Sequence, residues 1–214
     1  MAKISWCGQS CFQIAVSNSK DHSAQIVIDP YDEKLGLKVP NLSGEILLIT
    51  HDHPDHNNIK AVKGDPFVIS TPGEYEVKGV FIKGISADHG EKRGKIIIYT
   101  MEAEGLRFCH LGDLGQKELS SDQLDQIGLI DVLMIPVGGT YTISGQEAQK
   151  IISQIEPKMV IPMHYDIKGL ELKLDGVDKF LKAIGKHSVI PQEKLLVKSN
   201  SLPKDGTEVV ILLP

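Results

Sequence analysis

One segment of this chain gathers three histidines and two aspartates: His51-Asp52-His53-Pro54-Asp55-His56. It follows residues 45–50, whose apolar run is typical of a strand buried on both faces. Imidazole and carboxylate donors reach a single ion most easily when one tight loop presents them. We therefore expect His51 and His53 to face one metal ion, and Asp55 and His56 to face a neighbouring ion. The alternative is a polar loop whose histidines only cap a helix.

Strands dominate the first half of the predicted structure. Short apolar or alternating runs between Gly, Ser and Asn residues predict strands at 4–7, 12–16, 25–28, 45–50, 67–70, 79–85, 95–100 and 106–110. Glu104-Gly105 predicts a hairpin between the last two of these strands. Pro54 suits the first turn of a helix, which we expect to reach about Lys63, and residues 72–75 predict a turn.

Helices are expected mainly after residue 115. Apolar residues at helical spacing predict helices at 119–127, 144–155 and 177–184, and Ser144 with Glu147 resembles a capping box. Further strands are predicted at 132–137, 159–162, 195–198 and 208–213. Many strands with helices toward the C-terminus favour a layered α/β sandwich with the helices outside.

Length, charge and cysteine content narrow the class of protein. The 214 residues are enough for one domain with a sizeable core, and we expect a single domain over 1–214. A net charge of −5 argues against a broad nucleic-acid surface. Three irregularly spaced cysteines indicate a reducing compartment. No signal-peptide layout is visible, and the longest apolar run, 127–137, is interrupted by Asp131, so we expect a cytoplasmic protein that crosses no membrane.

The histidine-rich segment is similar to the signature of the metallo-β-lactamase superfamily. Other stretches resemble the small stand-alone zinc-dependent hydrolase branch of that family, which is related to ascorbate-phosphate lactonases; they lie at 6–12, 28–30, 87–89, 110–113, 135–139 and 161–165. The resemblance implies a four-layer αββα sandwich and a site for two Zn²⁺ ions. Because imidazole and carboxylate donors also suit Mn²⁺ and iron, these metals are alternatives.

The family pattern implies three more ligands beyond the signature. His89 fits the third histidine of the first metal, because it follows a predicted strand and precedes Gly90. His110 is the alternative for that role, although we expect it to support the site or face the core. Asp113, between two glycines, fits a carboxylate that bridges both metals. His164, at the end of an apolar strand, fits the last ligand.

The resemblance also implies a reaction, in which a hydroxide that bridges two metal ions attacks an ester-like bond. Asp55 is expected to orient the nucleophile or take its proton. Tyr165 is expected to donate to a developing oxyanion, with Tyr141 as the alternative. Asp29 could orient the imidazole of a ligand, or only cap a turn. Close relatives often carry histidine in place of Gln9, which cannot titrate near pH 7.

The leading hypothesis is a hydrolase of a small-molecule substrate: a lactone, a thioester or a phosphodiester. Two alternatives remain, a non-catalytic metal-binding module of the same fold and a nucleic-acid phosphodiesterase. The acidic balance of the chain disfavours the second alternative. A closed structural site generally needs four ligands, and the predicted set exceeds that number. The sequence does not fix the substrate or the oligomeric state.

Overall fold

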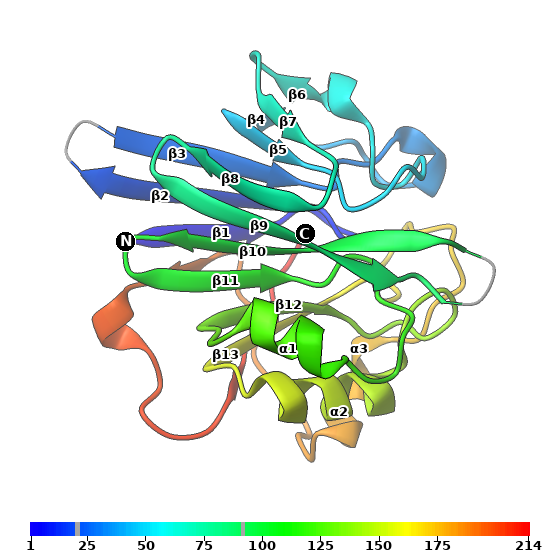
Figure 1. The fold of residues 1–214 in the computed structure, drawn as a ribbon. Coiled ribbons are helices and arrows are strands. Elements are labelled where there is room, and N and C mark those ends of the chain that lie inside the picture. The colour runs from blue at the N-terminus through cyan, green and yellow to red at the C-terminus, as the bar shows by residue number, and fades with distance from the viewer. Residues whose placement is uncertain (20–21, 91–92) are drawn as a thin grey trace.

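Two β-sheets pack face to face in the computed structural model, which describes residues 1–19, 22–90 and 93–214 (Figure 1). The six-stranded sheet has the order β14 (Leu195–Val197), β1 (Ala2–Trp6), β2 (Phe12–Ser19), β3 (His22–Ile28), β5 (Ile46–Leu48), β7 (Phe67–Ile69). The seven-stranded sheet has the order β15 (Glu208–Val209), β13 (Met159–Met163), β12 (Val132–Pro136), β11 (Leu106–His110), β10 (Lys95–Ala103), β9 (Val80–Asp88), β8 (Gly73–Val77). A small parallel sheet pairs β4 (Leu42–Ser43) with β6 (Val62–Lys63).

Two strands of the six-stranded sheet, β3 and β5, bury apolar side chains on both faces, as the apolar run at 45–50 predicted for β5. On β3, Ile26 and Ile28 point into the core between the sheets, whereas Val27 points into a second, smaller core outside. Neighbouring β5 divides in the same way, with Leu47 in the smaller core. Each such side chain contributes about 1.5–3 kcal/mol when it is fully buried. Burial on both faces is what a parallel pair such as β3 and β5 requires.

Three α-helices cover the outer face of the seven-stranded sheet (Figure 1): α1 (Ser121–Ile127), α2 (Gly145–Ile155) and α3 (Val177–Ala183). The predicted capping box of α2 is confirmed, because the Ser144 hydroxyl accepts from the N–H of Glu147 and the Glu147 carboxylate accepts from the N–H of Ser144. None of the helices in the described part of the chain is long and apolar enough to cross a membrane.

The predicted sandwich of two sheets with outer layers is confirmed. The outer layer over the six-stranded sheet is built from the small β4–β6 sheet and from 3₁₀ turns such as η1 (Glu33–Leu35) and η2 (Ile59–Ala61). Leu35, Leu42 and Val62 from these segments close the smaller core. The α-helices therefore all lie on the other side of the molecule (Figure 1).

The predicted helix from Pro54 to Lys63 is wrong. One turn forms, in which the carbonyl of His53 accepts from the N–H groups of His56 and Asn57 at 2.9 and 3.1 Å. The chain is then tied to the loop after β3, because Asn58 donates its backbone N–H to Pro30 and its side-chain amide to the carbonyl of Tyr31. Asparagine is a poor helix former that competes through such side-chain bonds, so the helix stops.

The predicted turn at 72–75 is also wrong in part, because β8 begins at Gly73 and pairs antiparallel with β9. Lys78 and Gly79, with φ of 50° and 73°, make the hairpin between them. On β8 an exposed Glu74 pairs with Lys83 of β9 at 2.8 Å. Turn-forming residues are tolerated at the start of β8 because it is an edge strand with one hydrogen-bonded neighbour.

Candidate metal centre

All of the predicted metal ligands meet at one edge of the sandwich, in loops that follow β5, β9, β11 and β13. Strands β9 and β11 both run antiparallel to β10, and β12 and β13 run parallel to β11, so these strand ends share one edge. The donor atoms form two groups, within each of which all atoms lie within 4.8 Å of one another: His51, His53 and His89; and Asp55, His56, Asp113 and His164.

Three histidine rings form the first group. The ring centroids of His51 and His53 lie 4.4 Å apart, and His89 lies 4.8 Å from His51 and 5.2 Å from His53. His89 directly follows β9, and its backbone N–H donates to the carbonyl of Gly94 at 3.1 Å. The structure thus brings His89 from a different sheet to the two histidines of the signature segment.

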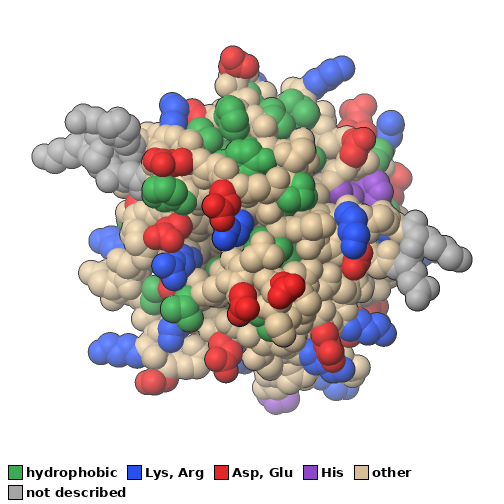
Figure 2. All heavy atoms as spheres, in the orientation of Figure 1, with side chains coloured by type: hydrophobic (Ala, Val, Ile, Leu, Met, Phe, Trp, Pro, Cys, Tyr) green, Lys and Arg blue, Asp and Glu red, His purple; other side chains and the backbone are tan. Residues whose placement is uncertain are grey.

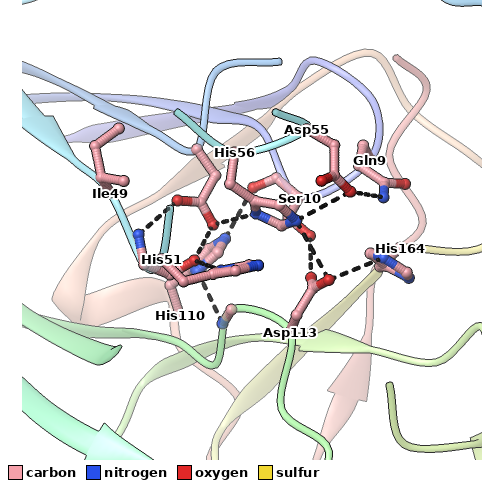
Figure 3. Close-up of polar contacts among 12 residues, drawn as sticks. Gln9, Ser10, Ile49, His51, Asp55, His56, His110, Asp113 and His164 are labelled. Carbon is pink, nitrogen blue, oxygen red and sulfur yellow. Dashed lines mark hydrogen bonds and ion pairs between the residues drawn. The ribbon is translucent and has the colours of Figure 1, made fainter. Parts of the chain in front are cut away.

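Asp113 is the centre of the second group (Figure 3). Its Oδ2 lies 3.2 Å from Nε2 of His164, 3.3 Å from Nε2 of His56 and 3.7 Å from Nε2 of His89. Asp55 completes the group, with Oδ2 3.4 Å from Nε2 of His56. Because His89 belongs to the first group, the carboxylate of Asp113 lies between the two groups, which is the position a bridging ligand needs.

Buried nitrogen atoms without hydrogen-bond partners mark the place where metal ions would fit. Among the described residues, these include Nε2 of His51, Nε2 of His56, Nδ1 of His89 and both ring nitrogens of His164. A buried polar atom that has no partner costs about 1–3 kcal/mol, so such atoms rarely accumulate without a reason. Their clustering around one carboxylate fits two divalent cations.

A hydrogen-bonded relay under the site fixes two of the three histidines that follow β5, His51 and His56. Oδ2 of Asp29 accepts from Nδ1 of His56 at 2.9 Å and from the hydroxyl of Thr50 at 2.6 Å. Because Thr50 donates to Asp29, its oxygen accepts from Nδ1 of His51 at 3.0 Å. Nδ1 of each ring is therefore engaged below the site, and Nε2 of each ring is the atom left without a hydrogen-bond partner, as a metal ligand requires.

Asp29 thus contacts the imidazole of a ligand candidate, His56, as predicted. Thr50 was missed by the sequence reasoning, and its position just before His51 is the one signal that could have suggested a role. Oδ1 of Asp29 also accepts from the backbone N–H of Thr50 at 2.8 Å, which locks the relay to the end of β5.

Burial and charge act against each other on the ionisable groups of the centre. Burial raises the pKa of Asp113, but the charges of His164 and His56 outweigh burial and hold this pKa well below its usual range. Burial lowers the pKa of His56, but the carboxylates of Asp113 and Asp29 raise it well above the ordinary value. Burial, followed by the charge of His56, lowers the pKa of His51 to about 3, so this ring is neutral at pH 7. A neutral imidazole is the form that binds a metal.

His110 lies close to the centre but has both ring nitrogens engaged. Its Nδ1 accepts from the N–H of Gly112 at 3.1 Å, and its Nε2 donates to the carbonyl of Ser10 at 2.9 Å. The buried ring also meets Phe12 edge to face, with centroids 5.7 Å apart. His110 therefore has no free lone pair for a metal, which favours His89 as the third histidine of the first group.

Replacing these two histidines separates their roles. His89→Ala is expected to remove about one metal ion per chain, because it deletes one of the three donors of the first group. His110→Ala is expected to keep the metal content and to lower the free energy of unfolding by about 3 kcal/mol, because it leaves two buried partners unsatisfied. Metal analysis and urea denaturation of both variants measure this. The reverse pattern would make His110 the ligand.

Two tyrosines were predicted to assist catalysis, and they lie in different places. The ring of Tyr165 packs on Trp6 with centroids 4.9 Å apart, and its burial raises the pKa of the hydroxyl. Tyr141 instead lines a cavity of about 210 Å³ that opens beside the metal-ligand candidates. The inner wall of this cavity is formed by His53, Asp55, His89 and Asp113.

The turn between β1 and β2 adds two polar side chains to the site (Figure 3). Nε2 of Gln9 donates to Oδ2 of Asp55 at 3.3 Å, and its backbone carbonyl accepts from the N–H of His164 at 3.0 Å. The hydroxyl of Ser10 donates to Oδ1 of Asp113 at 3.2 Å. Gln9 thus orients both the carboxylate of Asp55 and the backbone of His164. Ser10 was missed, because its residue type and spacing carry no signal.

Known proteins resemble this chain over most of its length. A model of the beta-lactamase superfamily domain matches residues 3–164. A UPF0173 metal-dependent hydrolase of Thermococcus onnurineus is 28% identical, and a UPF0173 protein of Pyrococcus abyssi is 31% identical; each match covers 78% of this chain and 85% of the relative. A crystal structure of a presumed Zn-dependent hydrolase from Thermotoga maritima superimposes with a TM-score of 0.81 and 38% identity, over 100% of both chains. These matches confirm the resemblance inferred from the sequence: the chain belongs to the metallo-β-lactamase superfamily.

Proposed function

We propose that this chain is a metal-dependent hydrolase that binds two metal ions, preferably Zn²⁺, and cleaves an ester-like bond in a small substrate. Lactones, thioesters and phosphodiesters are the candidate substrates. The observation that carries this proposal is the placement of Asp113 between two neighbouring groups of metal-ligand candidates. The relatives named as metal-dependent hydrolases support the same assignment.

The residues of the centre have different expected roles in metal binding and catalysis. His51, His53 and His89 would hold one ion, and Asp55, His56 and His164 the other, with the carboxylate of Asp113 shared. Two bound divalent ions lower the pKa of a water between them and stabilise negative charge that develops on the substrate. Asp55 is the candidate to orient that water or take its proton, since it lines the cavity and keeps one oxygen on Gln9.

Burial raises the pKa of Asp55, but its hydrogen bond to His56 and the charge of that ring lower it below the ordinary value. The carboxylate is therefore ionised at neutral pH, as a ligand or a proton acceptor must be. Tyr141 lines the cavity and is the better placed of the two tyrosines to donate to an oxyanion, whereas the buried ring of Tyr165 packs on Trp6.

An open cavity distinguishes this proposal from a non-catalytic metal-binding module. Structural metal sites are generally closed by four protein ligands, whereas catalytic sites keep a position for water and substrate. Here the candidate ligands His53, Asp55, His89 and Asp113 line the cavity wall. At about 210 Å³, this cavity is smaller than the roughly 300–1,000 Å³ of pockets for drug-sized ligands, which favours a small substrate.

Metal content is the measurement that tests the proposal first. We expect tag-free protein to contain about two transition-metal ions per chain by plasma mass spectrometry, and to hydrolyse at least one lactone, thioester or phosphodiester. His51→Ala should lose metal and activity together, because it removes a donor of the first group. One ion per chain would point to a structural or oxidative role, and no metal after addition of zinc would overturn the hydrolase proposal.

A further inference from the structure

The outer wall of the cavity carries a cation that the metal centre does not use. Besides the metal-ligand candidates, the cavity is lined by Asp32, Lys34, Leu35, Pro54, Arg93, Tyr141 and Leu172. In the view of Figure 2, histidine side chains reach the surface at the right, next to a lysine or arginine side chain. The cavity thus has a polar inner half for the metals and an outer half with a positive rim.

Of the two basic residues on the rim, Lys34 has its charge balanced by the carboxylate of Asp32. Its Nζ lies 3.8 Å from Oδ2 of Asp32, and its backbone N–H donates to the other carboxylate oxygen of the same residue. Arg93 forms no ion pair with any carboxylate in the described part of the chain, which omits residues 91 and 92. Its guanidinium is therefore the rim cation that is available to a ligand.

Arg93 is held in place by a cation–π contact. The guanidinium carbon lies 4.4 Å from the centroid of the Tyr141 ring. A guanidinium that stacks on an aromatic face keeps the N–H groups on its edge free, and this fork matches a carboxylate or a phosphate. Stacking also lowers the conformational entropy that the side chain loses when it binds an anion.

Both partners of this contact are tied by backbone hydrogen bonds to segments that carry metal-ligand candidates. Arg93 donates its N–H to the carbonyl of Gly90, the residue after His89. Tyr141 lies in the loop between β12 and α2, where Ile143 donates its N–H to the carbonyl of Leu114, the residue after Asp113, at 2.9 Å. The rim cation is thus fixed relative to the metal-ligand candidates, and a ligand that spans the small cavity would reach both.

We propose that Arg93, supported by Tyr141, binds an oxyanion group that the substrate carries away from its scissile bond. The substrate class is then a small ester-like molecule with a distal carboxylate or phosphate. This inference rests on the proposed hydrolase function of the same cavity, and it specifies in addition that the substrate is negatively charged. Leu35 and Leu172 give the space between the two ends an apolar wall, which suits a short carbon skeleton.

Matched lactones test the proposal. Three γ-butyrolactones are compared with metal-loaded protein: one with a carboxylate substituent, one with a phosphomethyl substituent and one with an uncharged carboxamide. Arg93→Met is expected to raise KM for the charged lactones on the order of tenfold to a hundredfold, and to leave the carboxamide unchanged. Arg93→Lys should recover part of the loss, because it keeps the charge without the fork. The two charged lactones show whether a carboxylate or a phosphate is preferred.

A binding measurement makes the result independent of catalysis. Dissociation constants of cyclopentanecarboxylate, cyclopentylmethyl phosphate and cyclopentanecarboxamide, none of which has a lactone bond, are measured by calorimetry on the same proteins. The wild type should bind at least one anion about tenfold more tightly than the amide, and Arg93→Met should remove the difference. Tight anion binding without lactone hydrolysis would contradict the proposed reaction but would support anion binding by Arg93.

The control is the other arginine of the chain, Arg107, which pairs with Glu102 at 3.2 Å and does not line the cavity. Arg107→Met should leave all constants unchanged. Equal effects of Arg93→Met on charged and uncharged ligands would mean that the side chain only holds the loop, and would overturn the proposal. An unchanged anion preference in Arg93→Met would overturn it as well.

Discussion

Asp113→Ala is expected to strip metal from both halves of the centre and to lower kcat/KM by about a thousandfold or more. The carboxylate of Asp113 lies within 3.7 Å of His56, His89 and His164, so its loss removes a donor of the second group and the carboxylate that lies beside His89 of the first group. About a thousandfold corresponds to roughly 4 kcal/mol of lost transition-state stabilisation. Plasma mass spectrometry and hydrolysis assays on the same preparation measure both effects.

The matched control is Asp125→Ala, which removes an exposed aspartate of α1 that is remote from the site. This variant should keep its metal and its activity. Circular dichroism of both variants establishes that a loss of metal does not come from unfolding. If Asp113→Ala retains about two ions per chain, Asp113 is not a bridging ligand, and the division of the centre into two groups must be redrawn.

Local chemistry explains why much of the fold was predictable. The hairpin at Glu104-Gly105 needs two residues with positive φ, and both adopt it, at 56° and 66°. The capping box of Ser144 and Glu147 needs only residues three apart in one turn. In contrast, the conformation of residues 54–63 depends on a different loop. The carbonyls of Pro30 and Tyr31 in that loop accept hydrogen bonds from Asn58. The residue types within one segment do not reveal hydrogen bonds to a loop that is distant in the sequence.

The candidate site also contains some residues that the sequence could indicate and others that it could not. The ligand candidates of the segment 51–56 were visible because residues of one loop are close by necessity. His89, Asp113 and His164 were assigned through a family resemblance, since nothing in their spacing brings three strand ends together. The relay from Asp29 through Thr50 to His51 spans two loops and involves a common residue type. The contact between Arg93 and Tyr141 likewise depends on the packing of two distant loops, and no pattern in the sequence indicated it.

Gly115→Ala is expected to destabilise the fold and to damage the first group of ligands together. A Cβ atom at Gly115 would lie 2.2 Å from the carbonyl oxygen of His89 and 2.6 Å from the nitrogen of Gly90. Backbone atoms at these distances must move, since no flexible side chain can give way. Overpacking of this kind costs about 3 kcal/mol in the free energy of unfolding. Urea denaturation measures this cost, and metal analysis should show the loss of about one ion as His89 is displaced.

Gly206→Ala is the comparison that separates a steric clash from strain in the backbone. Gly206 has a φ of 67° and open space around its Cα, so alanine there costs about 1 kcal/mol from its left-handed backbone and leaves the metal centre intact. The predicted defect of Gly115→Ala arises instead from the close approach of the loop after β11 to the turn of His89, where the N–H of Gly115 also donates to Asp88. If Gly115→Ala unfolds no more easily than Gly206→Ala and keeps both ions, then this contact between the loops does not position His89.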